Sequence, residues 1–191
     1  MRIAIVGNGR SLVTSEFGQE IDSHDLVIRM NLFYKLLDKK ITGVKTDVWA
    51  CCFNWVDMYI DEPNVDIREV WVTRPVYWDN KPNARGVWKI PEWVHPRVTQ
   101  SLTDQEHGQH QRILTAMGGS NPTTGLNTVL MANKLFPNIV KDLYGYDFYE
   151  PAKYYYDEAD IEFPIFHHHK PSIEKKIILQ MQEEGKVCWK R

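Results

Sequence analysis

The sequence has few cysteines and no long hydrophobic segment. Of its three cysteines, Cys51 and Cys52 are adjacent and Cys188 lies near the C-terminus, a spacing that builds neither a disulfide framework nor a zinc site. No apolar run approaches the roughly 20 residues needed to span a bilayer, and the opening stretch MRIAIVGNG is too short in apolar residues for a secretory signal. We therefore expect reduced thiols, no membrane span and a cytoplasmic location.

The sequence also lacks an excess of charge of one sign. Its formal net charge is −2, and acidic and basic residues are mixed along the chain. Proteins that bind nucleic acid gain most of their affinity from basic surfaces. Nucleic acid is therefore not expected as a partner.

The composition is that of a chain with one sizeable core. The 191 residues are 43% hydrophobic and 12% aromatic, and a length in this range predicts a single domain, here residues 1–191. Short β-type runs alternate with helical stretches, which predicts an α/β fold of Rossmann-like, three-layer type with a mainly parallel sheet. The predicted strands are Arg2–Val6, Leu26–Met30, Asp47–Cys52, Glu69–Thr73, Asp142–Tyr146 and Val187–Trp189, and the predicted helices are Gly125–Phe136 and Ser172–Glu184.

Residues 74–100, RPVYWDNKPNARGVWKIPEWVHPRVTQ, differ in composition and hydrophobic pattern from the rest of the chain. They are rich in proline and tryptophan, and their hydrophobic residues follow neither a helical nor a strand period. Such a segment is more typical of a packed irregular loop than of a separate domain, and long loops of this kind often contact ligands.

Glycines follow the first predicted strand. In AIVGNGRSL, Gly7, Asn8 and Gly9 stand where glycines let the backbone turn tightly and approach a phosphate. The dinucleotide fingerprint requires a third glycine at position 12, which is Leu12 here, so a nicotinamide or flavin enzyme is disfavoured. A tight strand–helix turn without a ligand remains the alternative.

The second predicted strand ends in polar residues. The stretch IDSHDLVIRMN places Arg29 and Asn31 at its carboxyl end, the edge where open α/β sheets bind ligands. Asn8 and Asn31 are therefore expected to face one site, with amides that donate to phosphate and accept from a sugar or base. Alternatively, Asn31 only caps the segment that follows.

The helix from residue 125 begins in an unusual way, at Thr123, Thr124 and Gly125. Threonine and glycine are poor residues for a helix interior, but a helix N-terminus has unpaired N–H groups and partial positive charge. The turn is consistent with either a plain cap or a bound anion.

Three consecutive histidines occupy positions 167–169. His167 and His169 would share a face in an extended segment, as metal ligands can, but no Cys, Asp or further His stands at a supporting spacing. A histidine acting as a general base is the favoured interpretation, since imidazole titrates near neutral pH. Surface histidines before a helix are the third possibility.

Four stretches of the sequence, in the order found here, together resemble the motifs of the animal-type sialyltransferases. VGNGRSL…IDSHDLVIRMN is similar to their L motif and NPTTGLNTVLMANKL…LYGYD to their S motif. YYYD, residues 154–157, resembles their short third motif, and His169 with Glu174 fits the His-x4-Glu of their last motif. The glycine loop and GYDFY also resemble the separate bacterial sialyltransferase family.

The chain departs from the animal pattern in three respects. The L and S motif stretches contain no cysteine, whereas the animal enzymes share a cysteine pair that ties them together; no membrane anchor or stem is visible; and Tyr154 stands where the third motif begins with histidine. The resemblance is therefore to a short, cytoplasmic bacterial or viral-like member.

The resemblance implies an enzyme that transfers sialic acid from CMP-sialic acid to a hydroxyl of an acceptor glycan, with inversion. A CMP donor leaves as a phosphate monoester, so less charge must be neutralised, and the sequence has no Asp-x-Asp pair to hold a metal. We therefore expect no metal and no cofactor. His169 is the expected base and Glu174 its support. The expected donor-binding residues are Gly7, Asn8, Gly9, Ser11, Asn31, Thr123, Thr124, Gly125, Gly145, Tyr146, Asp147, Tyr155 and Tyr156.

Two other functions fit the same residues. A transferase for another CMP-linked acidic sugar, such as Kdo, would use the same turn to meet a carboxylate. A non-catalytic module that binds CMP or a glycan would keep the pocket without turnover. The tyrosine run could also be only an aromatic edge of the core.

Overall fold

The computed structural model describes residues 1–35, 37–53, 62–75, 90–119, 121–148 and 169–191. All described strands join one parallel sheet of seven strands, in the order β5-β4-β3-β2-β1-β6-β7. The strands are β1 Ile3–Val6, β2 Leu26–Met30, β3 Val48–Cys51, β4 Glu69–Val72, β5 Val98–Ser101, β6 Lys141–Tyr144 and β7 Val187–Trp189. The fold is therefore α/β, as the sequence predicts.

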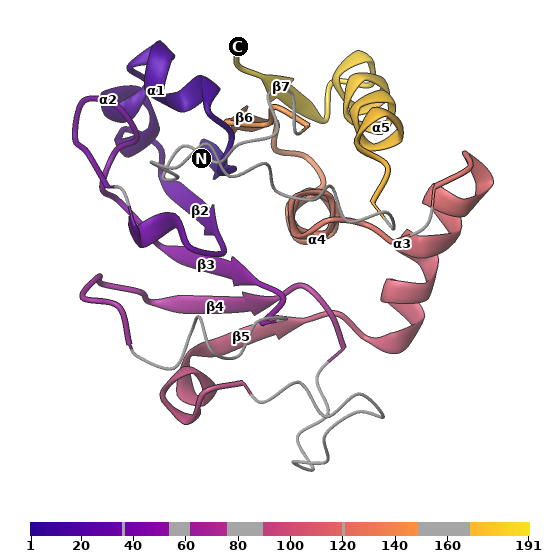
Figure 1. Ribbon diagram of the computed structural model, residues 1–191, viewed down its shortest axis with the longest axis horizontal. Coiled ribbons are helices and arrows are strands. Elements are labelled where there is room, and N and C mark those ends of the chain that lie inside the picture. Colours follow the sequence, from indigo (N-terminus) through magenta and orange to yellow (C-terminus); the bar gives the residue numbers. More distant parts are fainter. Residues whose placement is uncertain (36, 54–61, 76–89, 120, 149–168) are drawn as a thin grey trace.

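Helices cover both faces of this sheet (Figure 1). The helices are α1 Ser11–Ser15, α2 Gly18–Asp22, α3 Asp104–Ala116, α4 Thr124–Leu135 and α5 Pro171–Glu183, with short 3-10 turns η1 Phe33–Lys35 and η3 Glu92–Arg97. Figure 1 shows α1 and α2 on one side of the sheet and α3, α4 and α5 on the other. The result is the expected three-layer arrangement.

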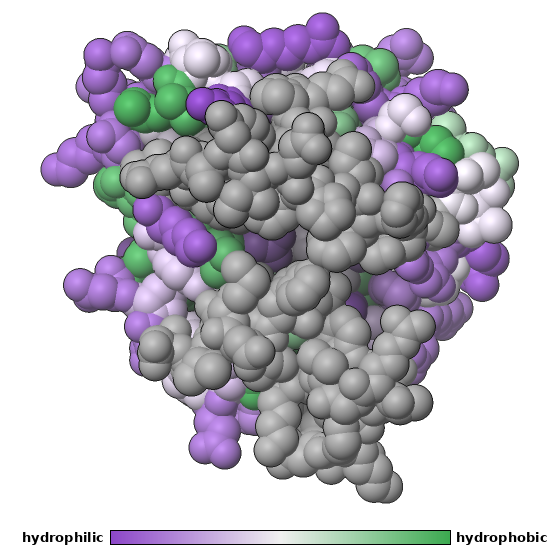
Figure 2. Space-filling view, viewed as in Figure 1, coloured by the Kyte–Doolittle hydropathy of each residue, from purple (hydrophilic) through white to green (hydrophobic). Residues whose placement is uncertain are grey.

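The core follows from strands that are apolar on both faces. β1 is buried at all four residues, as is β3, which is typical of parallel strands covered on both sides. One face packs Ile5 and Ile28 against Leu126 of α4 and Ile178 of α5. On the opposite face, the side chains of β1 and β2 pack on α1 and α2, and those of β3 and β4 on η1, η3 and their loops. On the face in Figure 2, the described surface is mostly hydrophilic, with scattered hydrophobic residues.

The six predicted strands and two predicted helices are confirmed, with ends that move by one or two residues. Among the described elements, β5, the short helices α1 and α2, helix α3 and the 3-10 turns η1 and η3 were not predicted. The interpretation of residues 74–100 as irregular was wrong for the part that forms η3 and β5; residues 76–89 lie outside the described residues. β5 reads VTQS and is an edge strand, so it needs no apolar run, and α3 has a single buried side chain, Leu114, so it has no apolar stripe.

Candidate functional site

The strand order places a topological switch point between β1 and β6. From β1 the chain builds β2 to β5 on one side, and then returns to add β6 and β7 on the other. In open parallel sheets, ligands bind in the crevice outside the carboxyl ends of the strands at such a point. The loops after β1, β2 and β6 therefore define the candidate site.

The loops after β1 and β6 meet closely enough to require glycine. The N–H of Gly9 donates to the carbonyl of Gly145 at 2.9 Å. A Cβ on Gly7 or Gly9 would lie 2.5 or 2.4 Å from that carbonyl oxygen, and Gly145 has φ +65°, a conformation that favours glycine. These three glycines thus serve loop-to-loop packing at the switch point.

Ser11 and Asp147 join the same two loops. Asp147 accepts hydrogen bonds from the N–H of Ser11, at 2.7 Å, and from its hydroxyl. An acidic side chain is favourable at a helix start, and Ser11 opens α1. The structure brings these two predicted donor-binding residues together, but they bind each other.

Asn8 and Asn31 stand at the carboxyl ends of neighbouring strands. Asn8 Nδ2 donates to the carbonyl of Met30 at 3.2 Å, which orients the amide so that Oδ1 is directed away as an acceptor. Asn31 adopts φ +48°, and its main-chain carbonyl accepts from Trp49 Nε1 at 2.8 Å. The Oδ1 atoms of Asn8 and Asn31 are both buried and have no hydrogen-bond partner among the described residues. Because unpaired buried polar atoms are rare and costly, this edge is suited to a ligand with hydroxyl or N–H donors.

The threonine at the start of α4 already contacts an anionic side chain. Thr123 caps the helix by accepting from the N–H of Leu126 at 3.2 Å. Its own N–H and hydroxyl donate to the two carboxyl oxygens of Glu174 at 2.8 and 2.6 Å. Glu174 is buried, and burial raises its pKa to about 7 although the hydrogen bonds from Thr123 lower it. At Thr123, the anion expected from the sequence is thus a side chain of the protein.

Thr124 and Gly125 complete the first turn of α4. No described residue accepts a hydrogen bond from their N–H groups, so these are the donors that this helix end offers to a ligand. Tyr146 supports the turn from below: its hydroxyl donates to the carbonyl of Gly125 at 3.2 Å, and burial raises its pKa well above the ordinary value. Tyr146 therefore contributes packing and a neutral hydroxyl.

His169 lies just before α5. Its Nδ1 is 2.9 Å from the carbonyl oxygen of Asn121. A carbonyl only accepts, so Nδ1 carries the proton and, in the neutral ring, Nε2 is the basic nitrogen. Tyr155 and Tyr156, like His167 and His168, lie outside the described residues.

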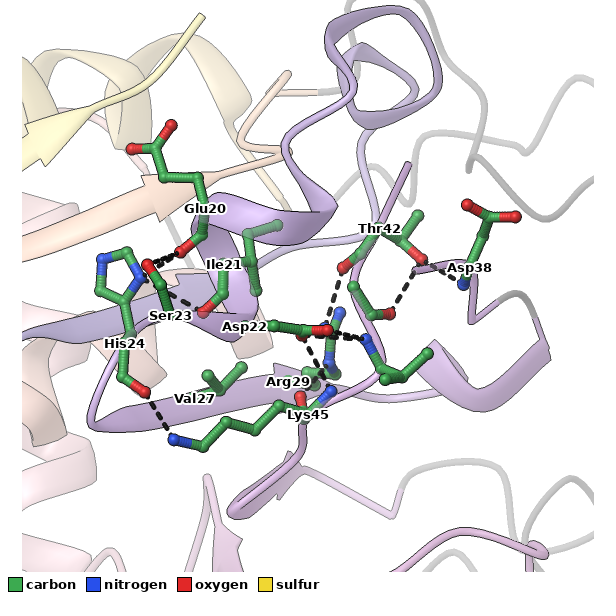
Figure 3. Close-up of polar contacts among 12 residues, drawn as sticks. Glu20, Ile21, Asp22, Ser23, His24, Val27, Arg29, Asp38, Thr42 and Lys45 are labelled. Carbon is green, nitrogen blue, oxygen red and sulfur yellow. Dashed lines mark hydrogen bonds and ion pairs between the residues drawn. The ribbon is translucent and has the colours of Figure 1, made fainter. Parts of the chain in front are cut away.

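Arg29, at the carboxyl end of β2, does not face this site. Its buried side chain lies on the α2 side of the sheet, where Nε donates to the carbonyl of Lys45 and a terminal nitrogen to that of Thr42, both at 2.8 Å (Figure 3). Asp22 accepts from the N–H groups of Val44 and Lys45 beside it. Arg29 thus holds the loop that leads into β3.

The comparisons with known proteins point to one family. The family model described as glycosyltransferase family 29 (sialyltransferase) matches residues 1–50, which include the glycine loop, Asn8 and Asn31. The Pan troglodytes CMP-N-acetylneuraminate-beta-galactosamide-alpha-2,3-sialyltransferase 4 is 24% identical over 97% of this chain and 64% of that relative. This chain is similar to sialyltransferases, over residues 1–50 by the family model and over nearly its whole length by this relative. It spans less than two thirds of the length of this curated relative.

Solved sialyltransferases share the fold. A mammalian sialyltransferase in complex with Gal-beta-1-3GalNAc-ortho-nitrophenol is 20% identical, with a TM-score of 0.62 over 99% of this chain and 68% of that one. CST-II of Campylobacter jejuni, in complex with CMP, is 16% identical, with a TM-score of 0.62 over 98% of this chain and 79% of that one. The Rossmann-like fold is therefore the one that sialyltransferases use.

The described residues lack two kinds of feature. They contain no helix long and apolar enough to cross a membrane. They also contain no group of three or more His, Cys, Asp and Glu side chains arranged to hold a metal ion.

Some site features could not be read from the sequence. The carbonyl of Met30 orients Asn8, but a main-chain atom leaves no trace in a residue pattern. The bond between Glu174 and Thr123 joins residues 51 positions apart; the only sequence signals were a carboxylate in the first turn of one helix and a threonine cap on another.

Proposed function

We propose that this chain transfers sialic acid from CMP-sialic acid to a hydroxyl of an acceptor glycan, with inversion at the anomeric carbon and without a metal ion. The observation that carries the proposal is the pair of buried, unpartnered amide oxygens of Asn8 and Asn31. They lie on adjacent strands at the carboxyl edge, where the hydroxyl and amino groups of a cytidine can donate to them. The named donor of one relative, CMP-N-acetylneuraminate, supports this choice.

Around this pair, the first turn of α4 meets the anionic part of the donor. The N–H groups of Thr124 and Gly125 stand at the positive end of a 12-residue helix, which favours a phosphate or a carboxylate. Tyr155 and Tyr156, which the family resemblance places at the departing phosphate, stay predictions. So do the domain boundary and the cytoplasmic location.

His169 is the proposed catalytic base. Nε2 takes the proton of the acceptor hydroxyl while that oxygen attacks the anomeric carbon. The bond from the anomeric carbon to the phosphate oxygen breaks, and its electron pair leaves with CMP. The bond from Nδ1 to Asn121 stabilises the imidazolium that forms, as an oriented hydrogen-bond partner does for a general base.

Calorimetry with CMP tests the nucleotide site. Asn8→Ala and Asn31→Ala should each weaken CMP binding by about 1–3 kcal/mol, the size of a lost buried polar contact. Asn121→Ala, which keeps the main-chain carbonyl and lies on another loop, serves as the control and should bind CMP as the parent does. If both asparagine variants bind CMP like the parent, the nucleotide site lies elsewhere.

Turnover tests the reaction. With CMP-N-acetylneuraminate and Gal-β-1,3-GalNAc-ortho-nitrophenol, His169→Ala should lower kcat by at least ~10²-fold and leave CMP affinity unchanged, because the base acts on the acceptor. His167→Ala and His168→Ala should cost much less. A severe loss in either of these, with His169→Ala active, would reassign the base.

A panel of donors separates the remaining functions. Transfer from a CMP-linked Kdo but not from CMP-N-acetylneuraminate would establish the other acidic sugar as the substrate. CMP binding without release of CMP from any donor and acceptor pair would make the chain a non-catalytic binding module.

A further inference from the structure

Three residues linked by hydrogen bonds, Thr73, Asn127 and His110, lie at the carboxyl end of β4, away from the residues discussed above. Asn127, on the buried face of α4, donates from Nδ2 to the carbonyl of Thr73 at 3.1 Å. Its Oδ1 lies 2.8 Å from Nδ1 of His110 on α3. Three elements that are distant in sequence thus meet at one point.

The two hydrogen bonds of Asn127 determine which nitrogen of His110 carries the proton. The carbonyl of Thr73 only accepts, so the Asn127 nitrogen must face it and Oδ1 must face the imidazole. Oδ1 also only accepts, so His110 Nδ1 is protonated and Nε2 carries the lone pair in the neutral ring. Burial lowers the pKa of His110, more than its bond to Asn127 raises it, which favours the neutral ring at neutral pH.

Within the described part of the chain, that lone pair has no hydrogen-bond partner. His110 is half-buried, and no described residue bonds to its Nε2. The Thr73 hydroxyl next to Asn127 is buried and also has no partner among the described residues. A neutral acceptor beside an unused hydroxyl suits a hydroxyl-bearing ligand better than an anion.

The position relative to the proposed donor site identifies which substrate this ligand belongs to. Asn127 lies three residues after Thr124, about one helical turn along α4. β4 is two strands beyond β2 in the sheet, or roughly 10 Å from it. With the nucleotide at β1 and β2, the carboxyl end of β4 lies farther along the same edge of the sheet, beyond the strands that the nucleotide occupies.

We propose that His110, oriented by Asn127, binds a hydroxyl group of the acceptor glycan through Nε2. His110 is a binding residue in this scheme, and Asn127 is a positioning residue. The assignment rests on the proposed transferase function, because it presumes an acceptor glycan.

Steady-state kinetics tests the proposal with the full chain, CMP-N-acetylneuraminate and Gal-β-1,3-GalNAc-ortho-nitrophenol. His110→Ala should raise the acceptor KM by at least ~10-fold, an effect within the range for one polar contact, and leave the hydrolysis of the donor in the absence of acceptor unchanged. His107→Ala, an imidazole one turn earlier on the same helix, is the matched control and should leave both unchanged. An unchanged acceptor KM in a folded His110→Ala variant overturns the proposal, and a raised donor KM instead assigns the hydroxyl to the donor sugar.

NMR of the parent protein covers the case in which a variant does not fold or no turnover is found. Long-range ¹H–¹⁵N spectra of the CMP-bound protein should show His110 protonated at Nδ1, and titration with the disaccharide should shift its Nε2 resonance. Such a shift without turnover keeps the binding site while refuting the transferase function. Absence of both the shift and this tautomer refutes the proposal. Asn127→Leu should abolish the single tautomer of His110. If Asn127 had only a structural role, the substitution would leave the tautomer unchanged.

Discussion

At the scale of single residues, the buried carboxyl group of Glu174 has a pKa far from its ordinary value. Its ordinary pKa is 4.5, and burial raises it to about 7. The native state therefore holds this proton more tightly than the unfolded chain. This contribution to stability is fully present below about pH 4, declines as the pH rises to about 7, and is lost above it. The change amounts to about 3 kcal/mol.

Replacing Glu174 by glutamine should remove this pH dependence. Urea denaturation of the parent and of Glu174→Gln between pH 4.5 and 8 should show the variant gaining stability relative to the parent as the pH rises. Taking the difference between the two proteins cancels the titration of all other groups. Parallel curves for the two proteins would show that Glu174 titrates normally in the folded state.

Gly9 is a second residue with a sharply defined role. An added Cβ would lie 2.4 Å from the carbonyl oxygen of Gly145 and 2.5 Å from Cγ of Asp147, and Ser11 holds that carboxylate in place. Gly9→Ala should therefore destabilise the protein by about 1–3 kcal/mol. Gly108, inside α3, has its nearest such neighbour at 3.7 Å, so Gly108→Ala should stabilise by about 0.5–1 kcal/mol. A melting temperature for each variant checks both signs.

At the scale of elements, α3 depends on its first turn more than on its buried face. Only Leu114 of this helix is buried, whereas Thr103 and Glu106 form a complete capping box. Thr103→Ala should cost about 1 kcal/mol in the free energy of unfolding. Thr115→Ala, on the exposed side of the same helix, should be neutral or slightly stabilising, because alanine has the higher helix propensity. Equal losses in the two variants would show that the cap contributes nothing.

The same capping box was the sequence signal that could have revealed α3. The stretch TDQE, residues 103–106, has the S/T-x-x-E pattern of a helix start, but the residues after it lack the apolar period that marks α4 and α5. The end of α4 shows the opposite case: its apolar face predicted the helix, whereas the partner of its Thr123 cap lies on α5 and depends on how the two helices pack.

At the scale of the whole molecule, the proposed reaction needs no metal. The helix end at Thr124 and Gly125 and the tyrosines of the third motif are proposed to meet the donor charge. Turnover should therefore survive EDTA and stay unchanged on addition of Mg²⁺ or Mn²⁺. Loss of activity on chelation, restored by one particular metal, would contradict this and direct attention to the histidines at 167–169.

The sequence by itself determined the fold class, six of the seven described strands, helices α4 and α5 and the resemblance to sialyltransferases, because these depend on local patterns. Apolar runs that are buried on both faces specify parallel strands. Short motifs can be recognised even where the overall sequence identity is low. Only the tertiary structure decided which predicted residues face a ligand. Ser11 and Asp147 bind each other, and Thr123 binds Glu174, while Asn8 and Asn31 keep unpaired oxygens. The physical reason is that a polar side chain's role depends on whether another part of the chain satisfies its hydrogen bonds, and that partner is chosen by packing between residues far apart in the sequence.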